Sequence, residues 1–334
     1  MVLLLLAALM AFLVLVPRQH PSLPVRVARR VAVLAAVVLL PLLSMVHFAP
    51  AFTVHLFYDL QRSVAGLQRH EATLPDGNRI VYLEGGSGDP LILIHGFGAN
   101  KDNFDLVARS LVGRWHVVVP DLLGFGESSH PPDADYSPAA QAERVRALAA
   151  VLGLGPKVHL GGSSMGGHIS LSWAAAHPEE VASLWLLDSG GIWSGPTSEL
   201  AATIQRTGVN MLVASNEEEF HRLFQFAMSK PPPMTDGMLD VLAQDRIRNH
   251  DLELRIFAQV RGDHLEDRIR GLRVPALIVW GREDRAIHVG TADVLHALLP
   301  DSRVVVLDGI GHLPMIEAPG RVVADYLAFR DGLH

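Results

Sequence analysis

The stretch Val158–Gly166, which reads VHLGGSSMG, decides how this chain is expected to fold. An apolar run, Val158–Gly161, leads into a serine that stands between glycines at the start of a helix-compatible segment. A nucleophile elbow requires that order, because its serine occupies a sharp, strained turn where flanking side chains would collide with the backbone. The stretch therefore predicts Ser164 as an attacking hydroxyl, with Gly162 and Gly166 as the glycines that permit the turn.

On both sides of this stretch, short apolar runs alternate with segments of helical spacing. The runs expected as buried strands are Leu91–Ile94, His116–Pro120, Val158–Gly161, Val181–Leu187, Ala276–Trp280 and Arg303–Leu307. The expected helices are Asp105–Leu111, Pro138–Leu152, Gly166–Ala176 and Thr291–Leu299. An antiparallel strand over Asn78–Glu84 is expected to precede them. This alternation predicts an α/β fold with a mostly parallel sheet, flanking helices, and functional residues at the carboxyl ends of the strands.

One long segment breaks the alternation. Residues from about Ile192 to Asp267 show helical apolar spacing, many charges and the tract Pro231–Pro233, but no convincing buried strand. An insertion of that length between two core strands is typical of a helical cap over the site. The expected domains are therefore a core at residues 71–191 and 268–334 and a helical cap at residues 192–267.

The N-terminus predicts a membrane anchor. Val2–Val16 and Val31–Val46 are apolar runs, and the segment between them contains four arginines, Arg18, Arg26, Arg29 and Arg30. A spanning helix needs about 20 apolar residues, so residues 1–51 are expected to hold one or two transmembrane segments. Because positive residues stay cytoplasmic, the catalytic domain is expected on the far, periplasmic side of the membrane. The alternatives are a signal peptide cleaved near Ala49–Ala51 and a start site placed too early.

Residues 52–70 follow the anchor and carry a separate pattern. From Phe52 onward apolar residues recur at steps of three and four, opposite a polar side. This spacing predicts an amphipathic juxtamembrane helix. Its apolar side suits contact with a membrane and docking on the domain's own surface about equally.

Composition narrows the class of protein. The chain has 334 residues, a formal net charge of −7 and no cysteine. It lacks the basic excess that would hold a nucleic-acid backbone, so no nucleic-acid partner is expected. Without cysteine there are no disulfides, thiolate nucleophiles or cysteine metal ligands. A homodimer is left open.

Acyl transfer by a serine needs a base, and His312 is the candidate. It lies in Gly309–Pro314, GIGHLP, directly after the last expected strand. A histidine on a glycine-loosened loop at the end of a sheet can bring its ring to the serine. The chain order of serine, acid and histidine is also the order that the nucleophile-elbow fold uses.

The acid that orients this base is expected to be Asp284. It follows the strand Ala276–Trp280, and its carboxylate would fix the tautomer of His312 and favour the imidazolium that forms during attack. Two other carboxyls are alternatives: Glu283 beside it, and Asp188 at the end of the preceding strand.

The oxyanion hole is expected from His95–Gly98, HGFG, which follows the strand Leu91–Ile94. The backbone N–H groups of Phe97 and of Met165, the residue after the nucleophile, would be the two donors. His95, Gly96 and Gly98 are expected to support the loop, with His95 in a structural role. The loop Asp121–Ser128 is expected to shape the same region through local turn contacts.

Taken in order, these motifs resemble the α/β-hydrolase superfamily over roughly residues 71–330. The segments His95–Phe104, HGFGANKDNF, and Ser164–His168, SMGGH, more narrowly resemble membrane-anchored bacterial lipases and phospholipases A and the monoacylglycerol lipases of animals. That resemblance implies hydrolysis of lipid carboxylic esters by a triad of Ser164, Asp284 and His312, with no metal and no cofactor. It also implies an anchor in a bacterial inner membrane, although such relatives usually have one span where this chain has two apolar runs.

Other functions share these groups. The same triad serves carbon–carbon bond hydrolases, aminopeptidases and perhydrolases, and only the cap and pocket distinguish them. A membrane-bound binding protein without turnover is the alternative of another class, although its usual sign, a lost triad member, is absent from this sequence. Serine at the elbow, where haloalkane dehalogenases and epoxide hydrolases carry aspartate, argues against those two activities.

Overall fold

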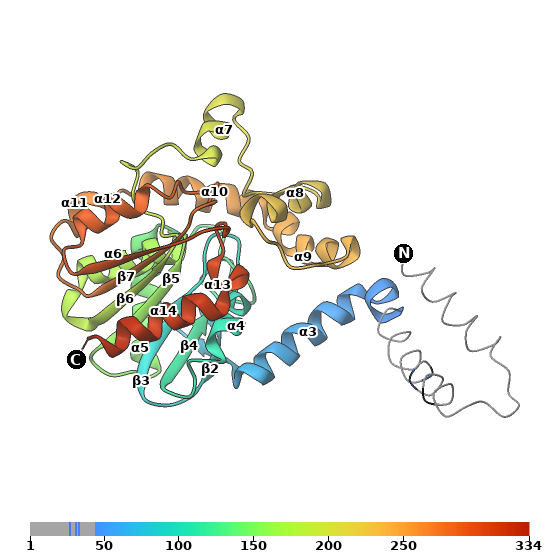
Figure 1. Ribbon diagram of the computed structural model, residues 1–334, viewed down its shortest axis with the longest axis horizontal. Coiled ribbons are helices and arrows are strands. Elements are labelled where there is room, and N and C mark those ends of the chain that lie inside the picture. Colours follow the sequence, from blue (N-terminus) through green and yellow to red (C-terminus); the bar gives the residue numbers. More distant parts are fainter. Residues whose placement is uncertain (1–26, 28–30, 32, 34–43, 334) are drawn as a thin grey trace, which may run out of the picture. The chain divides into compact units, whose positions relative to one another are not determined.

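The structure is a computed structural model that describes residues 27, 31, 33 and 44–333 (Figure 1). The two predicted apolar spans and the four arginines between them fall almost entirely outside the described residues. Across the residues that are described, no helix has both the length and the apolarity needed to cross a membrane. The chain forms two units, Met1–Phe57 with Met234–Val241, and Tyr58–Pro233 with Leu242–His334. The larger unit contains all of the predicted catalytic residues.

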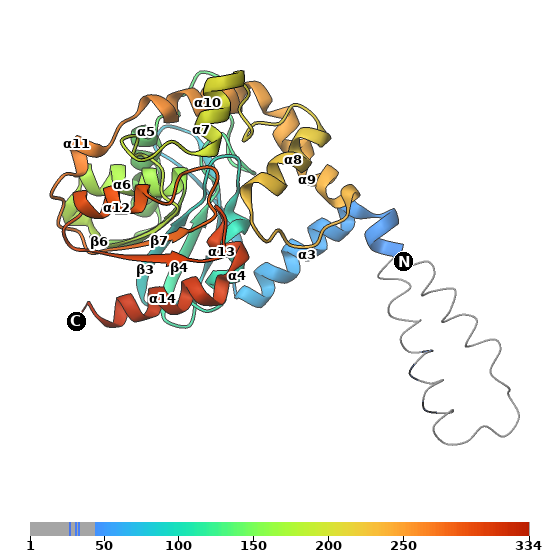
Figure 2. The same ribbon diagram turned by 45° about the horizontal axis from the view of Figure 1, so that its top comes forward.

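An eight-stranded sheet organises the larger unit, in the order β1-β2-β4-β3-β5-β6-β7-β8 (Figures 1 and 2). Its strands are β1 (Gln68–Thr73), β2 (Arg79–Gly85), β3 (Asp89–Ile94), β4 (Trp115–Pro120), β5 (Val158–Ser163), β6 (Val181–Leu187), β7 (Ala276–Gly281) and β8 (Ser302–Leu307). β2 runs antiparallel to both of its neighbours, and the pairs from β4 to β8 are parallel. The predicted mostly parallel sheet is confirmed.

Alternating side chains divide the strands between two apolar layers. In β3, Ile92 and Ile94 belong to one buried cluster, and Leu91 and Leu93 belong to the other. This follows from the two-residue period of a strand, which sends successive side chains to opposite faces. Because helices cover both faces, the central strands are continuous hydrophobic runs.

The helices of the core follow the sheet on its two faces. They are η1 (Lys101–Phe104), α4 (Asp105–Ala108), α5 (Pro138–Val151), α6 (Met165–Ala176), η2 (Pro178–Glu180), α12 (Thr291–Leu298), α13 (Pro314–Glu317) and α14 (Pro319–Asp331), and a further helix, α3 (Pro50–Ala65), precedes β1. Residues of α5, α6 and α12 join the cluster that contains Ile92, and residues of α4 and α14 join the cluster that contains Leu91. The result is a three-layer arrangement with the sheet in the middle (Figure 2).

The segment between β6 and β7 is helical, as expected. It contains α7 (Glu199–Thr207), α8 (Glu217–Ala227), α9 (Asp236–Arg248), α10 (His250–Gly262) and α11 (Glu266–Ile269). Ser198 and Asn216 cap α7 and α8, because their side-chain oxygens accept hydrogen bonds from Ala201 N and Glu219 N. In Figure 1, α7, α8 and α10 lie above the sheet.

The structure corrects the sequence prediction at one helix boundary and in the burial of one strand. The helix expected over residues 52–70 ends at Ala65, because Gly66 takes a left-handed conformation with φ +70°, and β1 begins at Gln68. β8 was expected to be buried on both faces, but it lies at the edge of the sheet, where Arg303 is exposed and most neighbours are half-buried.

In the last turns of α3, a charged side chain contacts the domain, and two apolar side chains are exposed. Arg62 donates two hydrogen bonds, at 2.6 and 2.8 Å, to both carboxylate oxygens of Asp102, which is buried. Leu60 and Val64 are 55% and 66% exposed. These two side chains are therefore not used to dock on the domain, whereas Leu67, the last apolar residue of the predicted stripe, is buried in the core.

Candidate active site

A strained serine stands at the carboxyl end of β5. Ser164 has φ 54° and ψ −117°, and within the described chain only it and Asp188 have positive φ among residues other than glycine. A Cβ on Gly162 would lie 2.3 Å from the carbonyl oxygen of Gly166, and one on Gly166 would lie 2.0 Å from that of Ile94. The backbone is thus too close for any other residue at either glycine, as the elbow requires.

The structure brings His312 and Asp284 together from the loops after β8 and β7. His312 Nδ1 lies 2.8 Å from Asp284 Oδ2, and both residues are buried. The other carboxylate oxygen of Asp284 accepts hydrogen bonds from Ala286 N at 2.8 Å and Ile287 N at 3.0 Å. A carboxylate held this way keeps the proton of His312 on Nδ1 and leaves Nε2 as the acceptor for a hydroxyl proton.

The alternative carboxyl Glu283 makes a different contact. Its Oε2 accepts a hydrogen bond from Ile310 N at 2.9 Å, which ties the loop of Asp284 to the loop of His312. Glu283 therefore helps to hold the loops of Asp284 and His312 next to each other.

Asp188, the other alternative, lies close to the pair of His312 and Asp284. It is fully buried, its Oδ1 accepts a hydrogen bond from Gly281 N at 2.9 Å, and its carboxylate lies within 4.8 Å of ligand atoms of Asp284 and His312. Burial and repulsion from Asp284 raise the pKa of Asp188 well above its ordinary value. Burial therefore favours the neutral form of Asp188, and the carboxyl that contacts His312 Nδ1 is that of Asp284.

His95 holds the predicted oxyanion loop from within. Its Nδ1 donates to Gly96 O at 2.8 Å, and its Nε2 accepts from Leu122 N at 3.0 Å. Burial lowers the pKa of His95, so the ring stays neutral. These contacts fit the structural role expected for this residue and leave the Phe97 amide to be positioned by the turn.

The loop after β4 is held by a buried charge network. Asp121 accepts hydrogen bonds at 2.8 Å from Lys101 N, Lys101 Nζ and Glu127 N, and its carbonyl oxygen accepts one from Ser128 Oγ at 2.7 Å. Gly126 has φ 54°, and a Cβ there would lie 2.4 Å from the Asp121 carboxylate. The expected loop-shaping role of this segment follows from these contacts.

A cavity of about 290 Å³ joins the nucleophile, the base and the insertion. Ser164 and His312 line it together with both predicted oxyanion donors, Phe97 and Met165. The insertion contributes mainly apolar side chains, including Ile192, Leu200, Ile204, Leu212, Phe257 and Val260. An apolar cavity with a few convergent polar groups is typical of a site for a small amphiphilic molecule.

Two further residues at this site were missed from the sequence. Glu317 in α13 accepts hydrogen bonds from the amides of Gly311, Ser229 and Lys230, which joins the loop of His312 to the end of α8. Arg246 in α9 donates to Gly98 O at 2.9 Å. Neither belongs to a recognisable motif, because each acts through a contact between segments far apart in the sequence.

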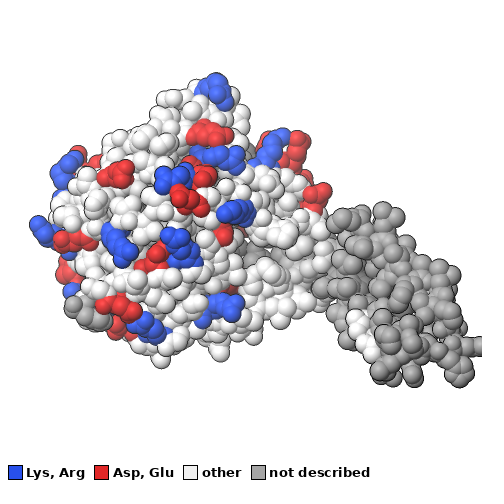
Figure 3. Space-filling model, in the orientation of Figure 1, with Lys and Arg blue, Asp and Glu red and all other residues white. Residues whose placement is uncertain are grey.

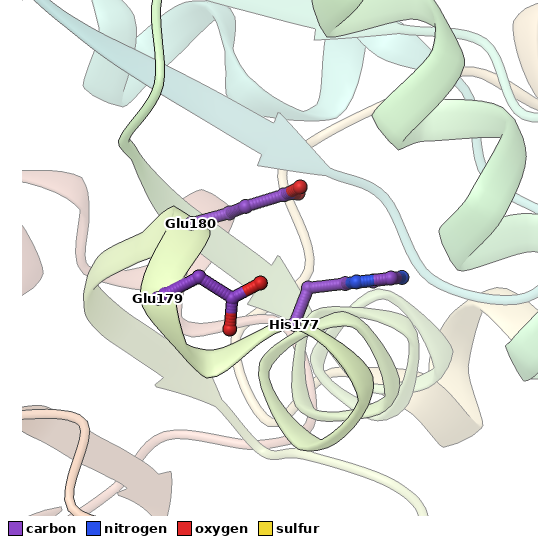
Figure 4. A group of neighbouring side chains, drawn as sticks. All are labelled: His177, Glu179 and Glu180. Carbon is purple, nitrogen blue, oxygen red and sulfur yellow. The ribbon is translucent and has the colours of Figure 1, made fainter.

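A cluster of His177, Glu179 and Glu180 lies away from this site, at the turn before β6 (Figure 4). Glu180 already accepts hydrogen bonds from Arg146 and from Trp173 Nε1, and His177 contacts Glu143. The ligand atoms of Glu180 and His177 are thus already engaged by neighbouring side chains. On the face drawn in Figure 3, acidic and basic residues are interspersed over the larger unit.

Comparison with known proteins places this geometry among hydrolases. A family model described as alpha/beta hydrolase fold matches residues 89–319. Lipase 1 of Psychrobacter immobilis is 42% identical over 277 residues, which cover 81% of this chain and 86% of the lipase. Monoacylglycerol lipase ABHD6 of Mus musculus is 27% identical over 302 residues, covering 84% of this chain and 88% of that protein.

A solved structure gives a similar result. A membrane phospholipase A, described as a bacterial virulence factor, superposes with a TM-score of 0.82 at 40% sequence identity. The match covers 90% of this chain and 98% of the phospholipase chain. The likeness therefore includes the segment between β6 and β7 as well as the sheet.

Proposed function

The chain belongs to the alpha/beta hydrolase fold family, and from that premise we propose that Ser164, His312 and Asp284 cleave lipid carboxylic esters through an acyl-enzyme. The protein is a carboxylic ester hydrolase that acts on lipids, as its similarity to lipases, a monoacylglycerol lipase and a phospholipase A supports. The observation that carries the residue assignment is the 2.8 Å contact of His312 with Asp284 in a cavity that Ser164 also lines.

The proposed reaction has two halves. His312 Nε2 accepts the proton of Ser164 Oγ as the oxygen attacks the ester carbonyl, and Asp284 stabilises the resulting imidazolium. The amides of Phe97 and Met165 donate to the oxyanion, since Met165 begins α6 and first-turn amides have no partner within their own helix. The tetrahedral intermediate collapses with proton transfer from His312 to the leaving alcohol oxygen. Water, deprotonated by the same imidazole, then releases the fatty acid from Ser164.

We assign the acyl-binding part of the site to the helical cap at residues 192–267. The apolar lining from α7 and α10 suits a hydrocarbon chain, and burial of each methylene in such a site contributes about 0.8 kcal/mol. The cavity volume of about 290 Å³ lies near the lower end for ligand sites. It suits one acyl chain with its ester, as in a monoacylglycerol or a lysophospholipid.

Membrane contact by α3 belongs to the same proposal. The exposed Leu60 and Val64 would insert at the interface while Arg62 holds the helix to the domain. Changing both apolar residues to glutamate is expected to lower hydrolysis of lipid in vesicles and to leave hydrolysis of soluble p-nitrophenyl butyrate unchanged. Val151→Glu, at an exposed position of α5, is the control. Equal loss on both substrates would contradict a membrane role.

The predicted anchor at residues 1–51 would hold the catalytic domain on the periplasmic side of a bacterial inner membrane. Similarity to a membrane phospholipase A supports membrane association. A phosphatase fused after His334 is expected to be active, whereas a fluorescent protein that requires the cytoplasm is expected to stay dark. The reverse pattern would contradict the topology.

The test of function itself is turnover. Purified protein is expected to hydrolyse p-nitrophenyl butyrate and monoacylglycerols, and Ser164→Ala is expected to lower the rate by about 10⁴-fold or more. A panel of monoacylglycerols, triacylglycerols, phospholipids and an aminoacyl amide separates lipid hydrolysis from the other reactions that use this triad. Absence of turnover in wild-type protein on every ester would favour the non-catalytic alternative.

A further inference from the structure

Arg246 is a buried cation near the C-terminal end of α9 in the segment between β6 and β7. It is 9% exposed, and its partner Glu253 in α10 is 2% exposed. Arg246 Nε donates to Glu253 Oε1, and Nη2 donates to Glu253 Oε2 at 2.9 Å. The pair is therefore bidentate, the geometry in which a planar guanidinium recognises a carboxylate best.

The same guanidinium also reaches the oxyanion loop. Its Nη1 donates to Gly98 O at 2.9 Å, and its Nη2 donates to Leu212 O at 2.6 Å. Its central carbon lies 5.7 Å from the centre of the Phe97 ring. One side chain thus joins two segments of the cap to the loop that supplies the Phe97 amide.

Gly98 is shaped for this contact. It has φ 64°, and a Cβ on it would lie 2.1 Å from the central carbon of the Arg246 guanidinium. The loop carbonyl that Arg246 holds lies only two peptide groups beyond the Phe97 N–H. Phe97 is fixed further by edge contacts of its ring with Phe125 at 5.9 Å and with Phe257 of α10 at 5.4 Å.

A buried ion pair of this kind contributes little net stability. Desolvation of the two charges offsets their attraction, and replacement of such a pair by apolar residues is often neutral. What Arg246 and Glu253 add is a fixed position for the Gly98 carbonyl, and a small displacement of an oxyanion donor has a large effect on rate.

We infer that Arg246 is a positioning residue: it couples the seating of the cap to the geometry of the oxyanion hole, with Glu253 orienting its guanidinium. This inference rests on the proposed function, because it concerns the donors of that reaction. It predicts that the Phe97 N–H points at the oxyanion only while Arg246 of α9 contacts the Gly98 carbonyl. The catalytic site is then complete when the cap covers the substrate.

The decisive variant removes both charges. Arg246→Met/Glu253→Leu leaves no unpaired buried charge but takes the donor away from Gly98 O. With p-nitrophenyl butyrate, kcat is expected to fall about tenfold while KM stays within about twofold, because the lost interaction belongs to the transition state. The Kd of an alkylboronic acid, whose adduct with the serine places an oxygen in the oxyanion hole, is expected to rise about tenfold as well.

Arg248→Gln is the matched control, since Arg248 lies on the same helix but is exposed and pairs with Asp245. Its kcat and boronic-acid Kd are expected to equal those of the wild type. Arg246→Lys serves as a second variant, because an ammonium cannot hold Glu253, Gly98 O and Leu212 O together. Its melting temperature is expected to stay near the wild-type value, with kcat several-fold lower.

The outcomes distinguish failure of the positioning role of Arg246 from failure of the proposed ester hydrolysis. A double variant that folds and keeps wild-type kcat and boronic-acid affinity overturns the positioning role, as does an Arg246→Lys protein with wild-type kcat. Failure of the wild type to hydrolyse any ester would instead overturn the proposed function.

Discussion

The elbow after β5 and the helical cap are fixed by different means. At the elbow, backbone packs on backbone, so Gly162 and Gly166 leave no space for a side chain and Ser164 stays in one strained conformation. In the cap, contacts between side chains from distant segments hold the structure in place, as in the contact of Arg246 with Glu253 and the Gly98 carbonyl. On the proposed function, the elbow would determine the chemistry and the cap would determine which substrate is accepted.

The largest effect is expected at the acid. Asp284→Asn lowers kcat by about 10⁴-fold, because the amide favours the wrong tautomer of His312. Glu283→Gln and Asp188→Asn are the neighbouring controls, and both are expected to stay within about tenfold of wild type, since the carboxylate oxygen that contacts His312 Nδ1 belongs to Asp284. A collapse of kcat in Asp188→Asn with little loss in Asp284→Asn would reverse the assignment.

The close backbone packing at the elbow predicts the next largest effect, a loss of stability. Gly166→Ala places a methyl group 2.0 Å from Ile94 O, so the protein is expected to lose more than about 3 kcal/mol of unfolding free energy or to fail to fold. Gly113→Ala is the control, because a Cβ there meets nothing within 4 Å. Chemical denaturation of both variants measures the difference, and equal stability would show that the elbow tolerates a side chain.

A cap substitution is expected to change substrate range without loss of chemistry. Ile204→Trp narrows the cavity, so kcat/KM for p-nitrophenyl octanoate falls about tenfold relative to the butyrate ester. Arg206→Trp, on an exposed position of the same helix, leaves the ratio unchanged. Parallel loss on both esters would mean that α7 supports the catalytic residues themselves.

The smallest effect concerns the pH dependence of stability that the buried carboxyl Asp105 contributes. Burial, followed by repulsion from Asp102, raises the pKa of Asp105 to about 8, against attraction from Arg62 and Lys101. The native state therefore keeps the Asp105 proton at pH values where the unfolded chain loses it. The contribution of this protonation to the free energy of unfolding is complete below the unfolded-state pKa of Asp105 and is lost as pH rises through about 8.

Asp105→Asn removes that dependence. The melting temperature of the variant is expected to exceed that of wild type above about pH 8 and to match it near pH 4. The exposed Asp251→Asn is the control. The same offset at both pH values would show that Asp105 does not hold a proton in the native state.

Local sequence was sufficient to predict the chemistry because the elbow, the HGFG loop and the histidine loop are each encoded by adjacent residues. The strands from β3 to β7 were predicted for a similar reason, since each is a continuous apolar run. β1 was missed, because its burial pattern is mostly exposed and its sequence, QRHEAT, is polar.

Contacts between distant segments account for what the sequence did not reveal. The run that contains Arg246 also holds Arg248 and several acids, and only the fold shows which arginine is buried against Glu253. The roles of Glu317 and of Asp188 likewise depend on loops that meet only in the folded chain. The choice between Asp284 and its neighbouring carboxyls needed the 2.8 Å contact with His312.

Covalent labelling of the nucleophile tests the central claim most directly. A p-nitrophenyl alkylphosphonate reacts with a serine that a histidine activates, and mass spectrometry of the digested protein identifies the labelled peptide. The account predicts one adduct, on Ser164, with the labelling rate lowered by several orders of magnitude in His312→Ala. An adduct on another residue, or equal labelling of Ser164 without His312, would contradict it.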